Sequence, residues 1–172
     1  MEAITIKKAS ISELVQLQEI GRTTFLHTFS TTDSEENMKI YLQSAFSTEK
    51  LTAEIQNPQS EFYLAALYEH VIGYLKINVG NAQTEIKDQN ALEIERIYVM
   101  GEFHGKKVGQ LLFEKALALA KQKKVDFIWL GVWEENHRAL QFYTKNGFTT
   151  FDSHTFLIGD EEQTDVMMKL KL

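Results

Sequence analysis

The feature that most constrains the fold is the nearly all-apolar run FIWLGVW at residues 127–133. A strand with one solvent face alternates apolar and polar residues, whereas a strand covered on both faces is apolar throughout. Helical patterns flank this run, at 104–123 before it and at 136–145 after it. The run therefore predicts an inner strand of a sheet that has helices packed against it.

The remaining elements predict the α/β (α+β) class, with a mixed sheet of about seven strands flanked by helices. The other predicted strands are 3–8, 61–68, 71–79, 92–99, 147–158 and 164–172. Helices are predicted after the capping box Ser10–Glu13, from Asp33 with Glu36, and over 47–56. Glu69-His70 is the predicted turn of a hairpin. No linker or repeat divides the chain, so a single domain over 1–172 is expected.

Composition excludes several classes of function. The chain has 172 residues, no cysteine, a net charge of −6 and a pI near 5.4. Disulfides, thiolate catalysis and Cys-based metal sites are excluded, and the acidic balance argues against nucleic-acid binding. The five histidines lack the spacing of a metal site. Neither a secretion signal nor an apolar run of 18 residues is found, so a cytoplasmic protein without a membrane span is expected.

The segment HGKKVG at 104–109 joins a predicted strand to a predicted helix. Glycines and the free amides of a helix N-terminus favour an anion at such a junction. The P-loop pattern is not met, because Gly101 and Gly105 are one residue too close and Lys107 stands where a hydroxyl is needed. The G-x-G-x-x-G pattern is absent as well. Alone, the segment is compatible with an anion cradle or with a tight turn.

A second segment, N-x-x-A-x-x-F-Y-x-x-x-G-F at 136–148, gives the cradle a context. With the glycine loop about 30 residues before it, this segment resembles the GNAT (Gcn5-related) N-acetyltransferase superfamily. The family loop reads [QR]-x-x-G-x-[GA]. Here His104 stands at the Gln/Arg position, Lys107 replaces the first glycine, and Gly109 matches the last. The segments LEIERIYV, IWLGVWEEN and GDEEQTD are similar to the PaiA-type spermine/spermidine N-acetyltransferases.

The resemblance implies acetyl-CoA, and hence coenzyme A, as the cofactor. Its pantetheine arm would run beside the strand at 97–99 like an added strand, and its pyrophosphate would lie on the cradle amides. A lysine at a glycine position requires that Lys107 keep a negative φ or that backbone strain be accepted. The residues that the resemblance implies in cofactor binding are Ile97, Tyr98, Val99, His104, Gly105, Lys106, Lys107, Val108, Gly109, Asn136, Ala139 and Tyr143.

The implied reaction needs a neutral amine. At a pKa near 10.4, only about one alkylamine in 2,500 is neutral at pH 7, so a base, a water relay or a site favouring the neutral form is required. Glu95 matches the family's glutamate base. Glu93 is the second candidate, or binds a distant ammonium group. Tyr143 matches the tyrosine general acid beside the CoA sulfur. Without cysteine, direct attack in a ternary complex is expected.

The implied substrate is a small-molecule amine, with the polyamines spermidine and spermine as leading candidates. The predicted pocket walls are Phe25, Phe29, Tyr74 and Trp133, with Glu93 as a further substrate contact. Seven acidic residues either attract a polycation or form ordinary solvated turns and caps. These acidic residues are Asp33, Glu35, Glu36, Asp160, Glu161, Glu162 and Asp165.

Alternatives to a polyamine remain open. They are a protein N-terminus, an aminoglycoside or another small amine as acceptor, or a CoA-binding regulatory module without turnover. The family resemblance also makes a homodimer a candidate assembly.

Overall fold

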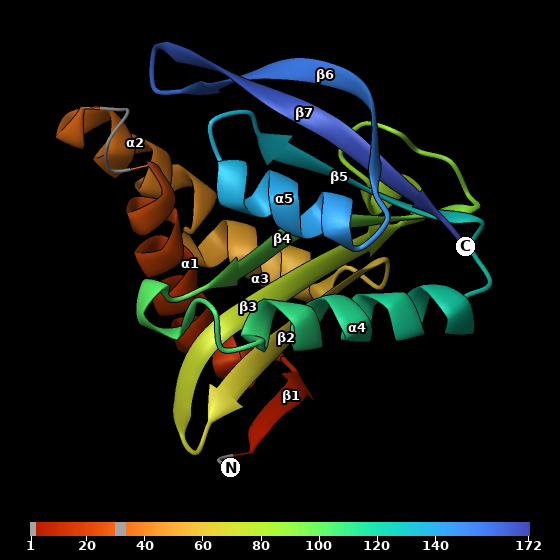
Figure 1. Cartoon of the computed structure of the whole chain (residues 1–172). Coiled ribbons are helices and arrows are strands. Elements are labelled where there is room, and N and C mark those ends of the chain that lie inside the picture. The colour runs from red at the N-terminus through yellow and green to blue at the C-terminus, as the bar shows by residue number, and fades with distance from the viewer. Residues whose placement is uncertain (1–2, 30–33) are drawn as a thin grey trace.

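The computed structural model describes residues 3–29 and 34–172 and contains one mixed seven-stranded sheet (Figure 1). Its strands follow the order β1-β2-β3-β4-β5-β7-β6. Only β4 and β5 pair in parallel, and all other neighbours are antiparallel. The strands are β1 Ile4–Lys8, β2 Ser60–Leu67, β3 His70–Val79, β4 Ala91–Val99, β5 Phe127–Trp133, β6 Thr149–Ile158 and β7 Glu161–Lys171. The predicted fold class and the inner position of 127–133 are confirmed.

Helices cover both faces of this sheet. The α-helices are α1 Leu14–Phe29, α2 Glu35–Ala45, α3 Thr48–Gln56, α4 Val108–Gln122 and α5 His137–Lys145. Helices α4 and α5 enclose one apolar core with the sheet, and α1, α2 and α3 enclose another on the opposite face (Figure 1). Within the part of the chain that the structure describes, no helix is long and apolar enough to cross a membrane.

Several local predictions need correction. The hairpin turn is Tyr68-Glu69, because Leu67 pairs with His70, and Tyr68 has a φ of 56°. Helix α4 begins at Val108, since 104–107 form a turn. Ser34 caps α2 by accepting from the amide of Asn37, while the predicted cap at residue 33 lies outside the described residues. The capping box before α1 is present, but its first turn, Ile11–Glu13, is a 3₁₀ helix.

Two irregularities in β4 shape the site. Its parallel pairing with β5 spans four residue pairs, from Ala91–Phe127 to Ile94–Leu130, and then ends. On its other edge, Lys76 pairs with Arg96 and Ile77 with Ile94, so Glu95 is the extra residue of a β-bulge. The strands β4 and β5 thus separate where the bulge re-aims the side chains of β4. We call this separation the splay.

Candidate active site

A cleft of about 1660 Å³ opens at the splay. Its lining comes from the outer half of β4, the turn before α4, the end of β5, α5, and parts of α1, α2, β6 and β7. Small-molecule pockets typically measure roughly 300–1,000 Å³. The cleft therefore has room for an extended cofactor together with a second substrate.

The turn before α4 forms one end of the cleft. The first helical hydrogen bond of α4 runs from Leu111 N to Lys107 O at 3.1 Å, so the amides of Val108, Gly109 and Gln110 have no carbonyl one turn back. Free amides and the helix dipole make such an end attractive to phosphate oxygens. The glycine spacing that predicted an anion cradle thus coincides with an open helix N-terminus at the cleft.

Lys107 caps α4 in the left-handed conformation, with φ 65° and ψ 14°. Lys107 therefore does not keep the negative φ that would avoid strain at this glycine position. Its backbone adopts the strained, left-handed conformation instead. Lys107 lines the cleft. Lys106 does not line it: its Nζ lies 5.3 Å from the ring centre of Phe103, and its amide donates to Phe103 O at 3.4 Å.

His104 ties this turn to the end of β4. Its Nε2 lies 2.8 Å from the carbonyl oxygen of Val99. Burial lowers the pKa of His104, although the bond to Val99 opposes this effect. A neutral imidazole with its proton on Nε2 then donates to Val99 and fixes the approach of the turn to the strand.

The outer half of β4 borders the cleft through Ile97, Tyr98 and Val99. Because β5 pairs with β4 only as far as Ile94, the β4 backbone beyond that point faces the splay instead of a neighbouring strand. An exposed strand edge is a ready partner for another extended, hydrogen-bonding chain. The amide-containing pantetheine arm of CoA has this character.

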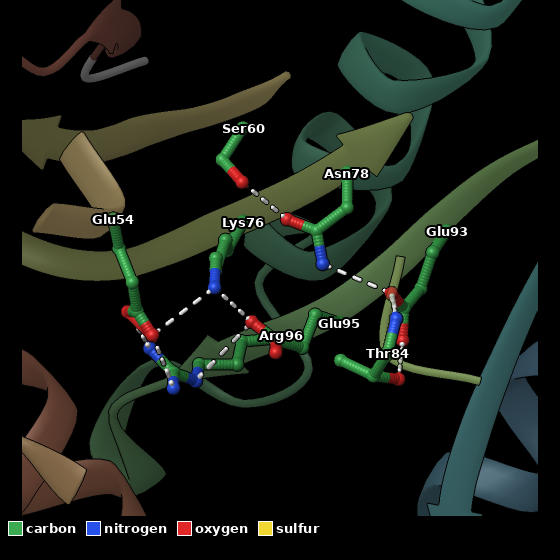
Figure 2. A network of polar contacts seen from close by, with 8 residues as sticks. All are labelled: Glu54, Ser60, Lys76, Asn78, Thr84, Glu93, Glu95 and Arg96. Atoms are coloured by element: carbon green, nitrogen blue, oxygen red, sulfur yellow. Dashed lines mark hydrogen bonds and ion pairs between the residues drawn. The ribbon is translucent and has the colours of Figure 1, made fainter. Parts of the chain in front are cut away.

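Glu95 lies in the cleft wall within an ion-pair network (Figure 2). It pairs with Lys76 and lies 3.9 Å from Arg96 Nε. Glu54 of α3 joins both cations, at 3.2 Å from Lys76 Nζ and 3.4 Å from Arg96 Nη2. Burial alone would raise the pKa of Glu95, but Arg96 and Lys76 outweigh it and lower the pKa. Glu95 is thus a carboxylate with reduced affinity for a proton.

Glu93 occupies a separate part of the polar network (Figure 2). Its oxygens accept from Asn78 Nδ2 at 2.9 Å, from Thr84 N at 2.8 Å and from Thr84 Oγ1 at 2.6 Å. Only 3% of Glu93 is exposed, and it does not line the cleft. The expectation that Glu93 meets the substrate is therefore corrected: its role is to hold the 80–90 loop against β4. Burial raises its pKa, with the Thr84 and Asn78 bonds opposing the rise.

Tyr143 and Asn136 enter the cleft from α5. The Tyr143 side chain is buried among Phe142 and Phe148, with ring centres 5.4 and 5.6 Å away. Burial, and to a smaller extent Tyr98, raises the pKa of Tyr143, so it remains a neutral hydrogen-bond donor. Asn136 Oδ1 accepts from Ala139 N at 3.2 Å and caps the helix. Both Asn136 and Ala139 line the cleft.

The predicted aromatic wall is assembled. Phe25, Phe29, Tyr74 and Trp133 all line the cleft. The rings of Phe29 and Trp133 lie 4.8 Å apart, and Tyr74 is stacked at 6.1 Å from Tyr98. An aromatic wall offers apolar contact to methylene groups and a favourable face to an alkylammonium group.

The acidic residues named from the sequence behave differently from one another. Asp165, in β7, lines the cleft. Asp160 instead accepts from Asn37 Nδ2 at 2.9 Å, joining the β6–β7 hairpin to α2. Glu35 and Glu36 are exposed in the first turn of α2, and the predicted residue 33 lies outside the described part. Among the described members of the acidic set, only Asp165 contributes to the cleft wall.

Sequence reasoning missed the environment of Asp165. Burial raises its pKa to about 6, an effect that His154 opposes and Glu85 reinforces. Tyr41 of α2 also lines the cleft and was not among the predicted site residues. Pairing of β6 with β7 places His154 opposite Asp165, a contact for which the sequence carries no local signal. Among residues 3–29 and 34–172, no cluster of three or more His, Asp or Glu side chains is arranged to hold a metal ion.

A splayed mixed sheet, with an open helix N-terminus and a buried tyrosine at the splay, is the framework of an enzyme that transfers acyl groups from CoA. Residues 19–148 match the acetyltransferase (GNAT) family. The chain belongs to this family and is an N-acetyltransferase that uses acetyl-CoA. The resemblance seen in the sequence, including that to PaiA-type enzymes, is confirmed.

Proteins of similar sequence and structure are also named N-acetyltransferases. An uncharacterized N-acetyltransferase of Lactobacillus delbrueckii subsp. lactis is 40% identical over 172 residues, covering 100% of this chain and 99% of the relative. A spermidine N(1)-acetyltransferase of Thermoplasma acidophilum is 30% identical over 155 residues, 88% of this chain and 91% of the relative. The crystal structure of PaiA N-acetyltransferase from Thermoplasma acidophilum in complex with coenzyme A has a TM-score of 0.82 at 28% identity, covering 99% of each chain.

Proposed function

We propose that the enzyme transfers the acetyl group of acetyl-CoA to a primary amine of a polyamine, by direct attack in a ternary complex. The observation that carries this proposal is the composition of the cleft at the splay. Glu95 and Asp165, two of the four carboxylates in its lining, lie there together with an aromatic wall. A cation with methylene spacers, such as spermidine or spermine, complements both features. The similarity to a spermidine N(1)-acetyltransferase supports the same substrate class.

The cofactor would lie along the splay. Its pantetheine amides would pair with the β4 backbone at Ile97, Tyr98 and Val99. Its pyrophosphate would meet the turn before α4 and the free amides at the start of that helix, those of Val108, Gly109 and Gln110. Lys107 would add a positive charge to the phosphates. When bound, acetyl-CoA supplies a thioester whose carbonyl carbon accepts the amine. Asn136 and Ala139 would flank the pantetheine, the small side chain of Ala139 leaving space for it.

Glu95 would draw the ammonium end of the substrate toward the splay. Its pKa is lowered by Arg96 and Lys76 despite burial, so it stays ionised but is a weak acceptor for the amine proton. The lowered pKa makes Glu95 a weaker base than an ordinary glutamate, so binding of the ammonium group suits it better than the predicted role of base.

Tyr143 would serve the departing sulfur. A free tyrosine, with a pKa of about 10, is already a weaker acid than a thiol at about 8.5. Burial raises the pKa of Tyr143 further, so complete proton transfer to a free thiolate is uphill. Tyr143 would instead donate a hydrogen bond to the sulfur and release its proton only as the tetrahedral intermediate collapses.

The experiment that tests this function is acetyl-CoA turnover with spermidine, spermine and a panel of other amines. The panel includes a peptide with a free N-terminus, an aminoglycoside and a small monoamine. Released CoA is read with a thiol reagent, and the enzyme itself adds no background because it has no cysteine. We expect a polyamine to give the highest kcat/KM, with sequential kinetics. Ping-pong kinetics, or turnover with another class but no polyamine, would overturn the proposal.

Replacing Tyr143 with Phe tests the site separately. Loss of a general acid typically costs roughly 10²–10⁴-fold in rate, and we expect kcat to fall in this range while acetyl-CoA affinity is kept. The matched control is Tyr68→Phe, because Tyr68 is 73% exposed at the hairpin tip. A cytoplasmic location and a homodimer stay predictions, the latter open to size-exclusion chromatography.

A further inference from the structure

Three side chains from distant parts of the chain form a line out of the cleft. Asp165 of β7 faces the cleft, and its Oδ2 lies 3.7 Å from Nε2 of His154 on β6. The other ring nitrogen of His154, Nδ1, lies 3.2 Å from Oε2 of Glu85. The exposed fractions of the three side chains rise along this line, from 21% through 27% to 40%. The line thus runs from the cleft wall toward solvent.

Gly131 of β5 makes room for this arrangement. A Cβ atom built on Gly131 would lie 3.2 Å from Asp165 Oδ2 and 3.5 Å from His154 Cε1. Gly131 directly follows Leu130, the last β5 residue paired with β4, and it lines the cleft itself. The carboxylate of Asp165 therefore reaches the point where β4 and β5 separate.

The surroundings of Asp165 differ from those of Glu95. Among the described residues, no lysine or arginine forms an ion pair with Asp165, and its charged or titratable neighbours are His154, Glu85 and the hydroxyls of Tyr41 and Tyr98. Burial raises the pKa of Asp165 to about 6, closer to neutrality than that of an ordinary carboxyl group. A base works best when its pKa lies near the working pH.

We propose that Asp165 accepts the proton of the attacking ammonium group and that His154 and Glu85 conduct this proton to solvent. The proposal rests on the proposed amine acetylation and adds to it a proton acceptor and an exit route. The 3.7 Å contact is longer than a hydrogen bond, and His154 Nδ1 has no hydrogen-bond partner among the described residues. Both transfers therefore require rotation of the imidazole ring or a bridging water. His154 is a positioning and relay residue, since it contacts Asp165 and not the cleft.

The reaction releases one proton to solvent per turnover, so it requires one proton acceptor beside the attacking amine. The ammonium group gives one proton to the Asp165 carboxylate, and the freed lone pair forms a bond to the thioester carbonyl carbon. The C–S bond then breaks, and its electron pair leaves on sulfur. The second proton of the former ammonium nitrogen balances the thiolate through Tyr143. One proton per turnover thus remains on Asp165, and the relay to Glu85 returns it to solvent.

The test compares the pH profiles of kcat/KM for wild-type enzyme, Asp165→Asn and His154→Gln. We expect Asp165→Asn to lower kcat roughly 10²–10⁴-fold. Protonated His154 lowers the pKa of Asp165, so His154→Gln should move the acid limb of the profile to higher pH. Matched controls are Asp152→Asn, on β6, and His70→Gln, at the β2–β3 turn, both exposed. Full activity of Asp165→Asn, or an unmoved acid limb in His154→Gln, overturns the proposal.

A second measurement needs no substrate. Imidazole nitrogen NMR compares the ring of His154 in wild-type protein and in Asp165→Asn. We expect removal of the Asp165 carboxylate to change the Nε2 chemical shift of His154, with that of His70 unchanged. Identical His154 signals in the two proteins refute the relay even when no amine turns over. Failure of the proposed function is distinct, because it appears as absent polyamine turnover by the wild-type enzyme.

Discussion

A lysine in a conformation that favours glycine flanks each end of helix α4. Lys107, the N-cap, has a φ of 65°. Lys124 has a φ of 57°, and the two bonds Lys124 N to Lys121 O and Val125 N to Ala120 O form a Schellman motif around it. A non-glycine residue in this region costs about 1–2 kcal/mol, whereas glycine adds unfolded-state entropy worth about 0.4–1 kcal/mol. Either substitution by glycine should therefore stabilise the protein by about 1 kcal/mol.

The measurement is urea unfolding of Lys107→Gly, Lys124→Gly and the double variant. The two sites are about 22 Å apart at 1.5 Å per residue over the 15 residues of α4, so the two gains should add. For a protein of this size, each gain should raise the melting temperature by about 2–4 °C. Lys107→Ala and Lys124→Ala are the controls, because alanine removes the charge and keeps the strained φ.

The two glycine substitutions should differ in their effect on cofactor binding. Lys107 lines the cleft and Lys124 does not. Lys107→Gly should weaken acetyl-CoA binding, more strongly at low salt, and Lys124→Gly should leave it unchanged. Glycine variants that are no more stable than their alanine counterparts would refute the assignment of strain to these positions.

Three further predictions concern buried groups. Lys76→Met should lower the unfolding free energy by about 3–5 kcal/mol at pH 7, because it leaves buried carboxylates without their cation. Since the folded-state pKa of Glu95 is lowered, this loss of stability should shrink as the pH falls below about 4.5. A loss that does not change with pH would contradict the argument. The pKa of Asp165 is raised from 3.8 to about 6, so its contribution to stability is lost as the pH rises through this window. The melting temperature of Asp165→Asn should therefore equal that of the wild type near pH 3.5 and exceed it at pH 7. A variant that is less stable than the wild type at pH 7 would count against the burial argument. Gly21→Ala would place a Cβ 2.3 Å from Phe46 Cε1 and should cost about 1–3 kcal/mol; Phe46→Leu in the same chain should restore part of this loss, and full stability of Gly21→Ala alone would disprove the close packing.

Local patterns in the sequence were sufficient for the sheet and most helices. The apolar run at 127–133 predicts an inner strand because burial on both faces removes the polar alternation, and β5 indeed lies between β4 and β7. The Ser10–Glu13 box places the entry to α1 because its bonds are made within four residues. The glycine loop before α4 was likewise expected from a short segment, whereas the aromatic residues of the cleft come from α1, β3 and β5 and were expected from the family resemblance.

Features that depend on distant partners were not predictable. The bulge at Glu95 arises from its pairing with β3, and it places this carboxylate beside Lys76, 19 positions earlier. Glu93 does not line the cleft, because the 80–90 loop folds back and Thr84 donates two hydrogen bonds to its carboxylate. Glu85 and Asp165 are 80 positions apart, and only the β6–β7 register brings His154 between them.

Because β4 pairs with β5 over only four residue pairs, we expect the proposed binding of the cofactor along β4 to be measurable by hydrogen exchange. Backbone amides on a strand edge exchange their protons with water unless a partner protects them. Past Ile94, the β4 edge that faces the splay gains such a partner when an extended ligand lies along it. Protection against deuterium exchange in this short stretch would then follow the ratio of cofactor concentration to its dissociation constant. A single peptide from β4, followed by mass spectrometry, would titrate the cofactor without any assay of turnover.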